Sequence, residues 1–155
     1  MRVVDSMIVT EYSELDHPPK ARHQLLGLGT NLEVRQKVFS ALEKEGYELS
    51  WVESREKLEQ RLGGGWSPDA ILIELLEPAE PLYALVRRIK RSSPETEIIF
   101  IACLEDMHHC MEAIQSGAYE FLPSRIDSDE LRSIIATLIK KKHLPAFTLA
   151  KRQSA

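Results

Sequence analysis

Four side chains that could bind a borderline metal lie close together in the sequence: Cys103, His108, His109 and Cys110. Thiolates and imidazoles are the ligands that Zn²⁺ takes in proteins. Neighbouring residues of an α-helix point about 100° apart, so no more than two of the last three could share an ion with Cys103. Cys110 is also expected to face the core, where free cysteine is a common small hydrophobic residue. We treat the four as weak metal candidates and expect no metal or cofactor.

A basic cluster ends the chain, formed by Lys140, Lys141, Lys142, His143, Lys151 and Arg152. Such a cluster could contact a nucleic acid, an acidic protein or a membrane surface. The alternative, which we favour, is a lysine-rich helix end stabilised by the helix dipole and followed by a solvated tail. Trp51 and Trp66 are isolated, so no aromatic platform for single-stranded nucleic acid is expected.

The composition excludes several classes of protein. The 155 residues carry 24 acidic and 20 basic side chains, a formal net charge of -4, which argues against direct binding of nucleic acid. Two cysteines cannot form the disulfide framework of a small secreted domain. No apolar run approaches the roughly 20 residues of a membrane span, and no secretory signal pattern is present at the start. We expect a cytoplasmic protein without membrane contact.

Short apolar runs alternate with amphipathic patterns along most of the chain. The runs at 25–28, 49–52, 70–73, 98–102 and 119–122 predict five strands, and the intervening patterns predict helices near 34–42, 54–62, 82–89, 107–114 and 131–139. Met107, Met111 and Ile114 are expected to face inward from the fourth helix, which Gly117 ends. This order predicts an α/β fold: a flavodoxin-like, doubly wound parallel sheet of order 2-1-3-4-5 with helices on both faces.

The regular pattern covers 23–142, preceded by an extension over 1–22 that contains a Pro-Pro linker and followed by a basic tail over 143–155. In doubly wound folds, a functional site lies beyond the carboxyl ends of the strands. The positions to inspect are therefore 29–30, 74–78, 102–103 and 123–125.

Four segments carry a resemblance to a known family. They are PDAILIELLEP at 68–78, GAYEFL at 117–122 with Asp127 and Glu130 after it, EVR at 33–35 and EGY at 45–47. Their types and spacing resemble the receiver domain of bacterial response regulators over 23–142. The resemblance implies a signalling module that accepts a phosphoryl group on an aspartate, with Mg²⁺ held by an acidic pair.

The same resemblance implies that every reactive position has changed. Glu74 stands at the phosphoacceptor position, Gly29 and Thr30 at the acidic pair, Ala102 at the hydroxyl switch position and Ser124 at the lysine position. Phe121 alone keeps a family-like residue, at the aromatic switch position. Losing one preorganised donor to a developing charge typically costs about 10²–10³ in rate. We therefore interpret the chain as a degenerate receiver, or pseudo-receiver, that is no enzyme.

Two interpretations of Glu74 stay open: a mimic of a phosphorylated aspartate, with Arg125 as its partner, or a partly solvated carboxylate bonded to Thr30 or to backbone amides. For the whole chain, we expect a non-phosphorylatable regulatory module of bacterial signal transduction or transcription control. It would act through contacts with a protein partner, an effector domain or a second copy, using the surface between Met107 and Lys142. Alternatives are a small metal-binding or enzymatic α/β protein, and a response regulator that is still phosphorylated.

Overall fold

The computed structural model describes residues 23–142. The predicted extension over 1–22 and tail over 143–155, with His143, Lys151 and Arg152, lie outside the described residues. The described part has no helix that is both long and apolar enough to cross a membrane.

A five-stranded sheet of order β2-β1-β3-β4-β5 forms the centre of the structure, and each neighbouring pair of strands is parallel. The strands are β1 (Gln24–Leu28), β2 (Glu48–Val52), β3 (Ala70–Glu74), β4 (Glu97–Ala102) and β5 (Glu120–Pro123). The predicted fold and strand order are thus confirmed. The central strand β3 is apolar over its first four residues because both of its faces are covered, and Ala70 to Ile73 have no exposed surface.

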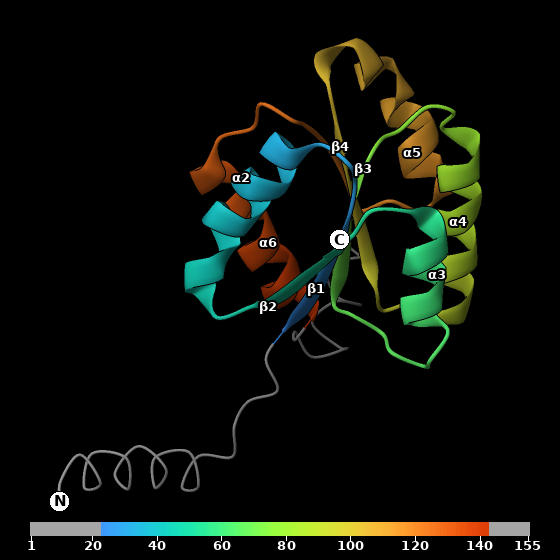
Figure 1. Ribbon diagram of the computed structural model, residues 1–155, viewed down its shortest axis with the longest axis horizontal. Coiled ribbons are helices and arrows are strands. Elements are labelled where there is room, and N and C mark those ends of the chain that lie inside the picture. The colour runs from blue at the N-terminus through green and yellow to red at the C-terminus, as the bar shows by residue number, and fades with distance from the viewer. Residues whose placement is uncertain (1–22, 143–155) are drawn as a thin grey trace, which may run out of the picture.

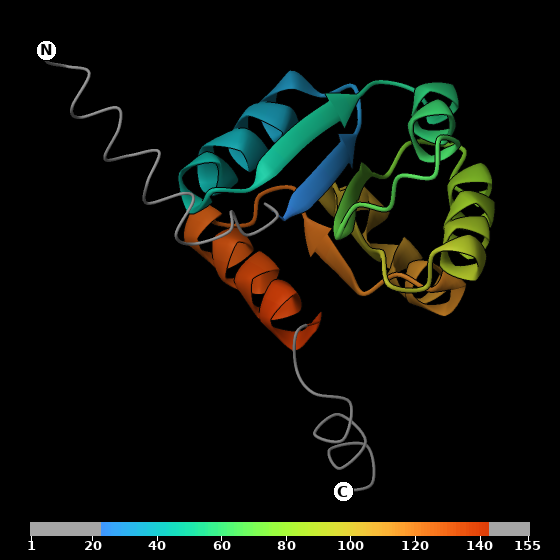
Figure 2. The same cartoon turned by 90° about the horizontal axis from the view of Figure 1, so that it is seen from below.

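Two helices cover one face of the sheet and three cover the other (Figure 1, Figure 2). On one face α2 (Leu32–Leu42), continued by the turn η1 (Glu43–Glu45), packs beside α6 (Ser128–Lys142). On the other face lie α3 (Arg55–Leu62), α4 (Glu80–Ser92) and α5 (Cys110–Ser116), which follows the 3₁₀-helix η2 (Leu104–His109). A separate hydrophobic core therefore lies between each face of the sheet and the helices that cover it.

Helix boundaries follow the expected capping chemistry. The Ser54 side chain accepts a hydrogen bond from the Lys57 amide at 3.2 Å, and Asp127 Oδ2 accepts one from the Asp129 amide at 3.0 Å. Gly46 and Gly117 end the segments before them with φ of 81° and 121°, which a residue with a Cβ rarely adopts.

One predicted helix is wrong in form and in the facing of two of its three large side chains, because Met107 packs against the core as predicted but Met111 and Ile114 do not. The segment expected at 107–114 begins as the 3₁₀-helix η2 and becomes α-helical only at Cys110. Met111 is 70% exposed and Ile114 is 42% exposed, whereas Ala113 is fully buried. The small side chains of α5, not its large ones, pack against the sheet. Its outer surface consequently carries two large apolar side chains, Met111 and Ile114, beside the exposed Glu112 and Gln115.

Candidate functional site

The positions that the resemblance identified converge at one edge of the sheet. Gly29 and Thr30 directly follow β1, Glu74 ends β3, Ala102 ends β4, and Ser124 directly follows β5. Because all strands are parallel and adjacent in the order given, these carboxyl ends lie side by side. The five positions therefore lie at one edge of the sheet, and their role as a functional site stays a prediction.

Glu74 is bound by the start of α2. Its Oε1 accepts hydrogen bonds from the amide N–H of Thr30 at 2.8 Å and from that of Asn31 at 3.0 Å. The next amides, those of Glu33 and Val34, donate to the Asn31 side chain, which caps the helix. A carboxylate at a helix N-terminus meets both free N–H donors and the positive end of the helix dipole. The interpretation of Glu74 as a carboxylate bonded to backbone amides is thus confirmed.

Gly29 provides the space that this arrangement needs. A Cβ at position 29 would lie 2.5 Å from Glu74 Oε1 and 2.8 Å from Glu74 Cβ, closer than real contacts allow. The Gly29 carbonyl accepts a hydrogen bond from Trp51 Nε1 at 3.0 Å, which fixes this loop against β2. Any side chain at position 29 therefore excludes the present conformation of Glu74.

The loop after β5 is held by backbone contacts. The Ser124 amide donates to the Ala102 carbonyl at 2.7 Å, and Lys37 Nζ of α2 donates to the Ser124 carbonyl at 3.0 Å. Ala102 is 1% exposed. Among the ion pairs of residues 23–142, none joins Arg125 to Glu74.

Phe121 points into the core formed with α4 and α5. It is 6% exposed, and its ring centroid lies 6.1 Å from that of Phe100, which in turn lies 5.9 Å from that of Tyr83. Burial, followed by the charges of Glu112, Glu77, Glu80 and Asp106, raises the pKa of Tyr83 to about 12. The predicted aromatic position thus lies behind the outer surface, within a row of three packed rings.

The four weak metal candidates do not come together. Cys103 Sγ donates a hydrogen bond to Asp106 Oδ2 at 3.1 Å, and this bond is the main cause that raises the pKa of the Cys103 thiol. His108 Nδ1 lies 3.0 Å from the Glu105 carbonyl, and Cys110 packs against the hydrophobic core.

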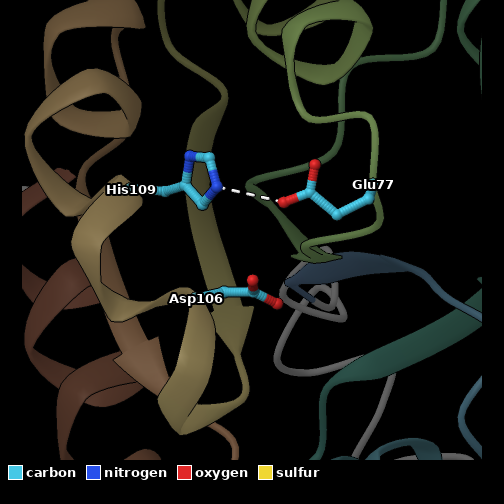
Figure 3. Close-up of side chains that lie close together, drawn as sticks. All are labelled: Glu77, Asp106 and His109. Carbon is cyan, nitrogen blue, oxygen red and sulfur yellow. Dashed lines mark hydrogen bonds and ion pairs between the residues drawn. The ribbon is translucent and has the colours of Figure 1, made fainter.

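His109 instead lies beside two carboxylates that the sequence reasoning did not single out (Figure 3). Its Nε2 is 3.0 Å from Glu77 Oε2, and one ligand atom each of Glu77, Asp106 and His109 lies within 4.8 Å of the others. Glu77 follows β3 and the other two belong to η2. A sequence signal for this group exists in the three-residue spacing of Cys103, Asp106 and His109, which aligns side chains directly one above another in a 3₁₀-helix.

Known proteins with similar sequences are regulatory proteins. The chain is 25% identical over 114 residues to the DNA-binding transcriptional regulator NtrC of Rhizobium meliloti (strain 1021), which covers 73% of this chain and 23% of the relative. It is 30% identical over 74 residues to the luminescence regulatory protein LuxO of Vibrio campbellii, covering 48% of this chain. The chain therefore spans about a quarter or less of the length of these curated relatives.

Solved structures of low sequence identity share the fold. A response regulator from Thermotoga maritima superposes with a TM-score of 0.70 at 19% identity, covering 77% of this chain and 98% of the other. NtrX from Brucella abortus gives a TM-score of 0.69 at 19% identity, covering 86% of this chain and 28% of the other. A family model, that of the response regulator receiver domain, matches residues 30–136. Since that match spans more than half of the sequence, the chain belongs to the response regulator receiver domain family.

Proposed function

We propose that this receiver domain does not accept a phosphoryl group and acts in two-component signalling through protein–protein contacts. The observation that carries the proposal is the engagement of the Glu74 carboxylate by the amides of Thr30 and Asn31, above a glycine at position 29. The carboxylate of Glu74, at the phosphoacceptor position, is thus already bound by backbone amides of the loop after β1.

The residues present do not fit the Mg²⁺ ion that the family resemblance implies. Mg²⁺ requires octahedral oxygen ligands at about 2.0–2.1 Å and gives up its water reluctantly, so it needs strong anionic ligands. Gly29 has no side chain and Thr30 offers only a neutral hydroxyl, which leaves Glu74 as the single carboxylate. Glu74 Oε1 already accepts two hydrogen bonds. We therefore derive no step through a magnesium ion.

The expected positions lack the groups that would stabilise a phosphoryl group during its transfer. Ala102 has no hydroxyl, and Ser124 carries no charge. Lys37 Nζ lies at the same loop but donates its hydrogen bond to the Ser124 carbonyl. Each missing donor typically costs about 10²–10³ in rate, so the combined loss should abolish phosphoryl transfer.

Phosphorylation chemistry tests this part directly. The full chain is incubated with acetyl phosphate and Mg²⁺, and its intact mass is measured; we expect no added phosphoryl mass. The positive control replaces the five positions together: Gly29→Asp, Thr30→Asp, Glu74→Asp, Ala102→Thr and Ser124→Lys. An added mass in the wild-type chain that disappears in Glu74→Ala would overturn the proposal.

Exposed apolar side chains of the η2–α5 segment support action through protein contacts. Leu104, Met111 and Ile114 of the η2–α5 segment are 62%, 70% and 42% exposed. Helix α5 contacts the edge strand β5, which α6 follows in the chain, and we call the surface of η2, α5, β5 and α6 the α5–α6 surface. It includes the region between Met107 and Lys142 for which the sequence analysis expects partner binding. We propose that this surface contacts a protein partner, an effector domain or a second copy of the chain.

Self-association is the simplest first test of that surface. We expect sedimentation analysis of the full chain to show a concentration-dependent dimer that Met111→Ser and Ile114→Ser weaken. The matched control is Leu32→Ser, because Leu32 is 63% exposed but lies on α2. A dimer that responds to Leu32→Ser and not to the α5 variants would exclude the surface. A chain that stays monomeric would exclude the second copy as the partner.

A further inference from the structure

A compact group of three metal-ligand side chains lies beside the degenerate phosphoacceptor pocket. Glu77 Oε2 and His109 Nε2 are 3.0 Å apart, and Asp106 offers an oxygen within 4.8 Å of the ligand atoms of both. Figure 3 shows the carboxylates of Glu77 and Asp106 directed toward the same space as the imidazole. The group is open on one side, because the Glu77 side chain is 60% exposed and that of His109 is 17% exposed.

The backbone holds this group in place from two adjacent strands. Glu77 lies in the loop between β3 and α4, and η2 follows β4, which pairs with β3. Side chains three residues apart eclipse one another in a 3₁₀-helix, so Asp106 and His109 project on the same side of η2. The three ligands therefore do not depend on one flexible loop.

The charges of the group are not balanced by basic residues. Among the ion pairs of residues 23–142, Glu77 pairs only with His109, and Asp106 pairs with no arginine or lysine. The two carboxylates carry two negative charges, which one divalent cation would neutralise.

Two buried polar atoms have no hydrogen-bond partner among the described residues: His109 Nδ1 and the hydroxyl of Tyr83, whose ring neighbours that of His109. Tyr83 is 2% exposed, and its ring centroid lies 6.3 Å from that of His109. Unpaired buried polar atoms are rare in native proteins and call for an explanation. A metal at Nε2 would fix the ring proton on Nδ1, the buried nitrogen of the ring.

We propose that Glu77, Asp106 and His109 bind one Zn²⁺ ion, with water completing a tetrahedral site. One imidazole with two carboxylates suits zinc, whereas Mg²⁺ and Ca²⁺ prefer oxygen ligands alone. Zinc bonds of about 2.0–2.2 Å require neighbouring ligand atoms to lie about 3.4 Å apart. The Glu77–His109 pair at 3.0 Å is close to that separation, and Asp106 needs to move by at most about 1.4 Å, which a side-chain rotation provides.

Cys103 takes a supporting part in this site. Its S–H donates to Asp106 Oδ2, which leaves Oδ1 free for the ion. Ligating carboxylates are commonly oriented by such second hydrogen bonds. Cys103 is therefore a positioning residue in this site and not a ligand.

Zinc titration of the full chain tests the proposal. The chain is stripped with a chelator and titrated with Zn²⁺ in competition with a chromophoric chelator, without an affinity tag. We expect one high-affinity equivalent that millimolar Mg²⁺ does not displace. Glu77→Gln, Asp106→Asn and His109→Asn should each lower the affinity by about tenfold or more, since loss of even an outer-shell partner typically costs 10–100-fold.

His108→Asn is the matched control, because His108 neighbours His109 but its Nδ1 faces the Glu105 carbonyl. This variant should keep its zinc affinity within about threefold. Zinc should also raise the unfolding midpoint of wild type and His108→Asn, but not of His109→Asn, because only a chain that binds zinc gains stability by mass action. Circular dichroism of each zinc-free variant is the check that the variant remains folded.

Three results would overturn the site: no saturable zinc binding by wild type, an equal loss of affinity in His108→Asn and His109→Asn, or displacement of zinc by millimolar Mg²⁺. These results are independent of the proposed function, because none of the three ligands belongs to the phosphoacceptor pocket. A chain that binds zinc and is also phosphorylated would refute the pseudo-receiver while leaving this site standing.

Discussion

Removal of the Glu74 side chain should destabilise the domain, even though glutamate lies at a solvent-accessible edge of the sheet. Glu74→Ala removes the acceptor of two amide hydrogen bonds, those of Thr30 and Asn31, at 2.8 and 3.0 Å. Net contributions of hydrogen bonds to a charged group are about 1.5–3 kcal/mol each. The two bonds share one oxygen and water can reach the freed amides, so we expect a combined loss of about 1.5–2 kcal/mol in the free energy of unfolding.

Glu74→Gln separates the charge from the hydrogen bonds. Its amide oxygen can accept the same two bonds, but it lacks the charge that interacts with the dipole of α2. The expected loss is therefore smaller, about 0.5–1 kcal/mol, in keeping with the usual strength of charge–dipole interactions at helix ends. Glu53→Ala is the control, because Glu53 is an exposed glutamate whose ion pair with Arg35 is long, at 3.9 Å. It should cost less than about 0.5 kcal/mol.

A double-mutant cycle with Gly29→Ala tests the geometry itself. The new Cβ would occupy the space of Glu74 Oε1, so Gly29→Ala should displace the carboxylate and break both bonds. Glu74→Ala should then cost much less in the Gly29→Ala background than in wild type, with a coupling energy of about 1–2 kcal/mol. Urea unfolding followed by far-ultraviolet circular dichroism gives each free energy.

Two outcomes would refute this reasoning. One is a Glu74→Ala variant whose free energy of unfolding lies within about 0.3 kcal/mol of that of wild type and of Glu53→Ala. The other is full additivity of Gly29→Ala and Glu74→Ala, which would mean that the two side-chain positions do not share the same space.

Other substitutions probe the remaining packing. Gly27→Ala should destabilise by about 1–3 kcal/mol and shift the fluorescence of Trp51, because a Cβ at position 27 would lie 2.1 Å from the Trp51 ring; an unchanged spectrum would contradict the close contact. Tyr83→Phe should leave the metal-free domain equally stable or up to about 1 kcal/mol more stable, since the hydroxyl is buried without a described partner; a clear loss would reveal a partner. Because the pKa of Tyr83 is raised from 10.0 to about 12, its neutral form is favoured in the folded state, so the associated stability is present below pH 10 and is lost between about pH 10 and 12. Wild type should therefore lose more stability than Tyr83→Phe over that interval, on the order of 1 kcal/mol, as measured by urea unfolding at each pH. Asp127→Ala removes the side chain that accepts from the Asp129 amide and should cost about 1 kcal/mol; an unchanged urea midpoint would show that this cap contributes nothing.

The sheet could be predicted from the sequence because burial on both faces leaves a strong pattern. The runs at 70–73 and 98–102 contain only apolar residues, and in the structure none of their side chains is more than 3% exposed. The convergence of positions 29, 74, 102 and 124 follows from the same pattern, since parallel strands present their carboxyl ends at one edge. Secondary-structure periodicity was sufficient for both conclusions.

The segment from Leu104 to Ser116 could not be predicted in the same way. Met107, Met111 and Ile114 have the spacing of a buried helix face, but only Met107 packs against the core. The inner side is completed by Cys110, Ala113 and Ser116, at intervals of three. Small side chains allow the helix backbone to approach the sheet, and a pattern based on large apolar residues does not register them. The switch from 3₁₀ to α geometry at Cys110 also altered which side chains meet. The group around His109 was missed for that reason.

Glu74 and Glu77 both lie near the carboxyl ends of the strands, but only Glu77 contacts a segment that leads into the α5–α6 surface. Glu74 connects β3 to the start of α2, on the face of the sheet opposite α5. Glu77 connects the β3–α4 loop to η2, whose last residue directly precedes α5 and its exposed Met111. An ion that binds Glu77 and His109 more tightly in one arrangement of η2 would favour that arrangement by its difference in affinity. On the proposed assignments, the amides of Thr30 and Asn31 hold the Glu74 carboxylate in place, and zinc at the neighbouring site would bind a segment that leads directly into the proposed partner surface.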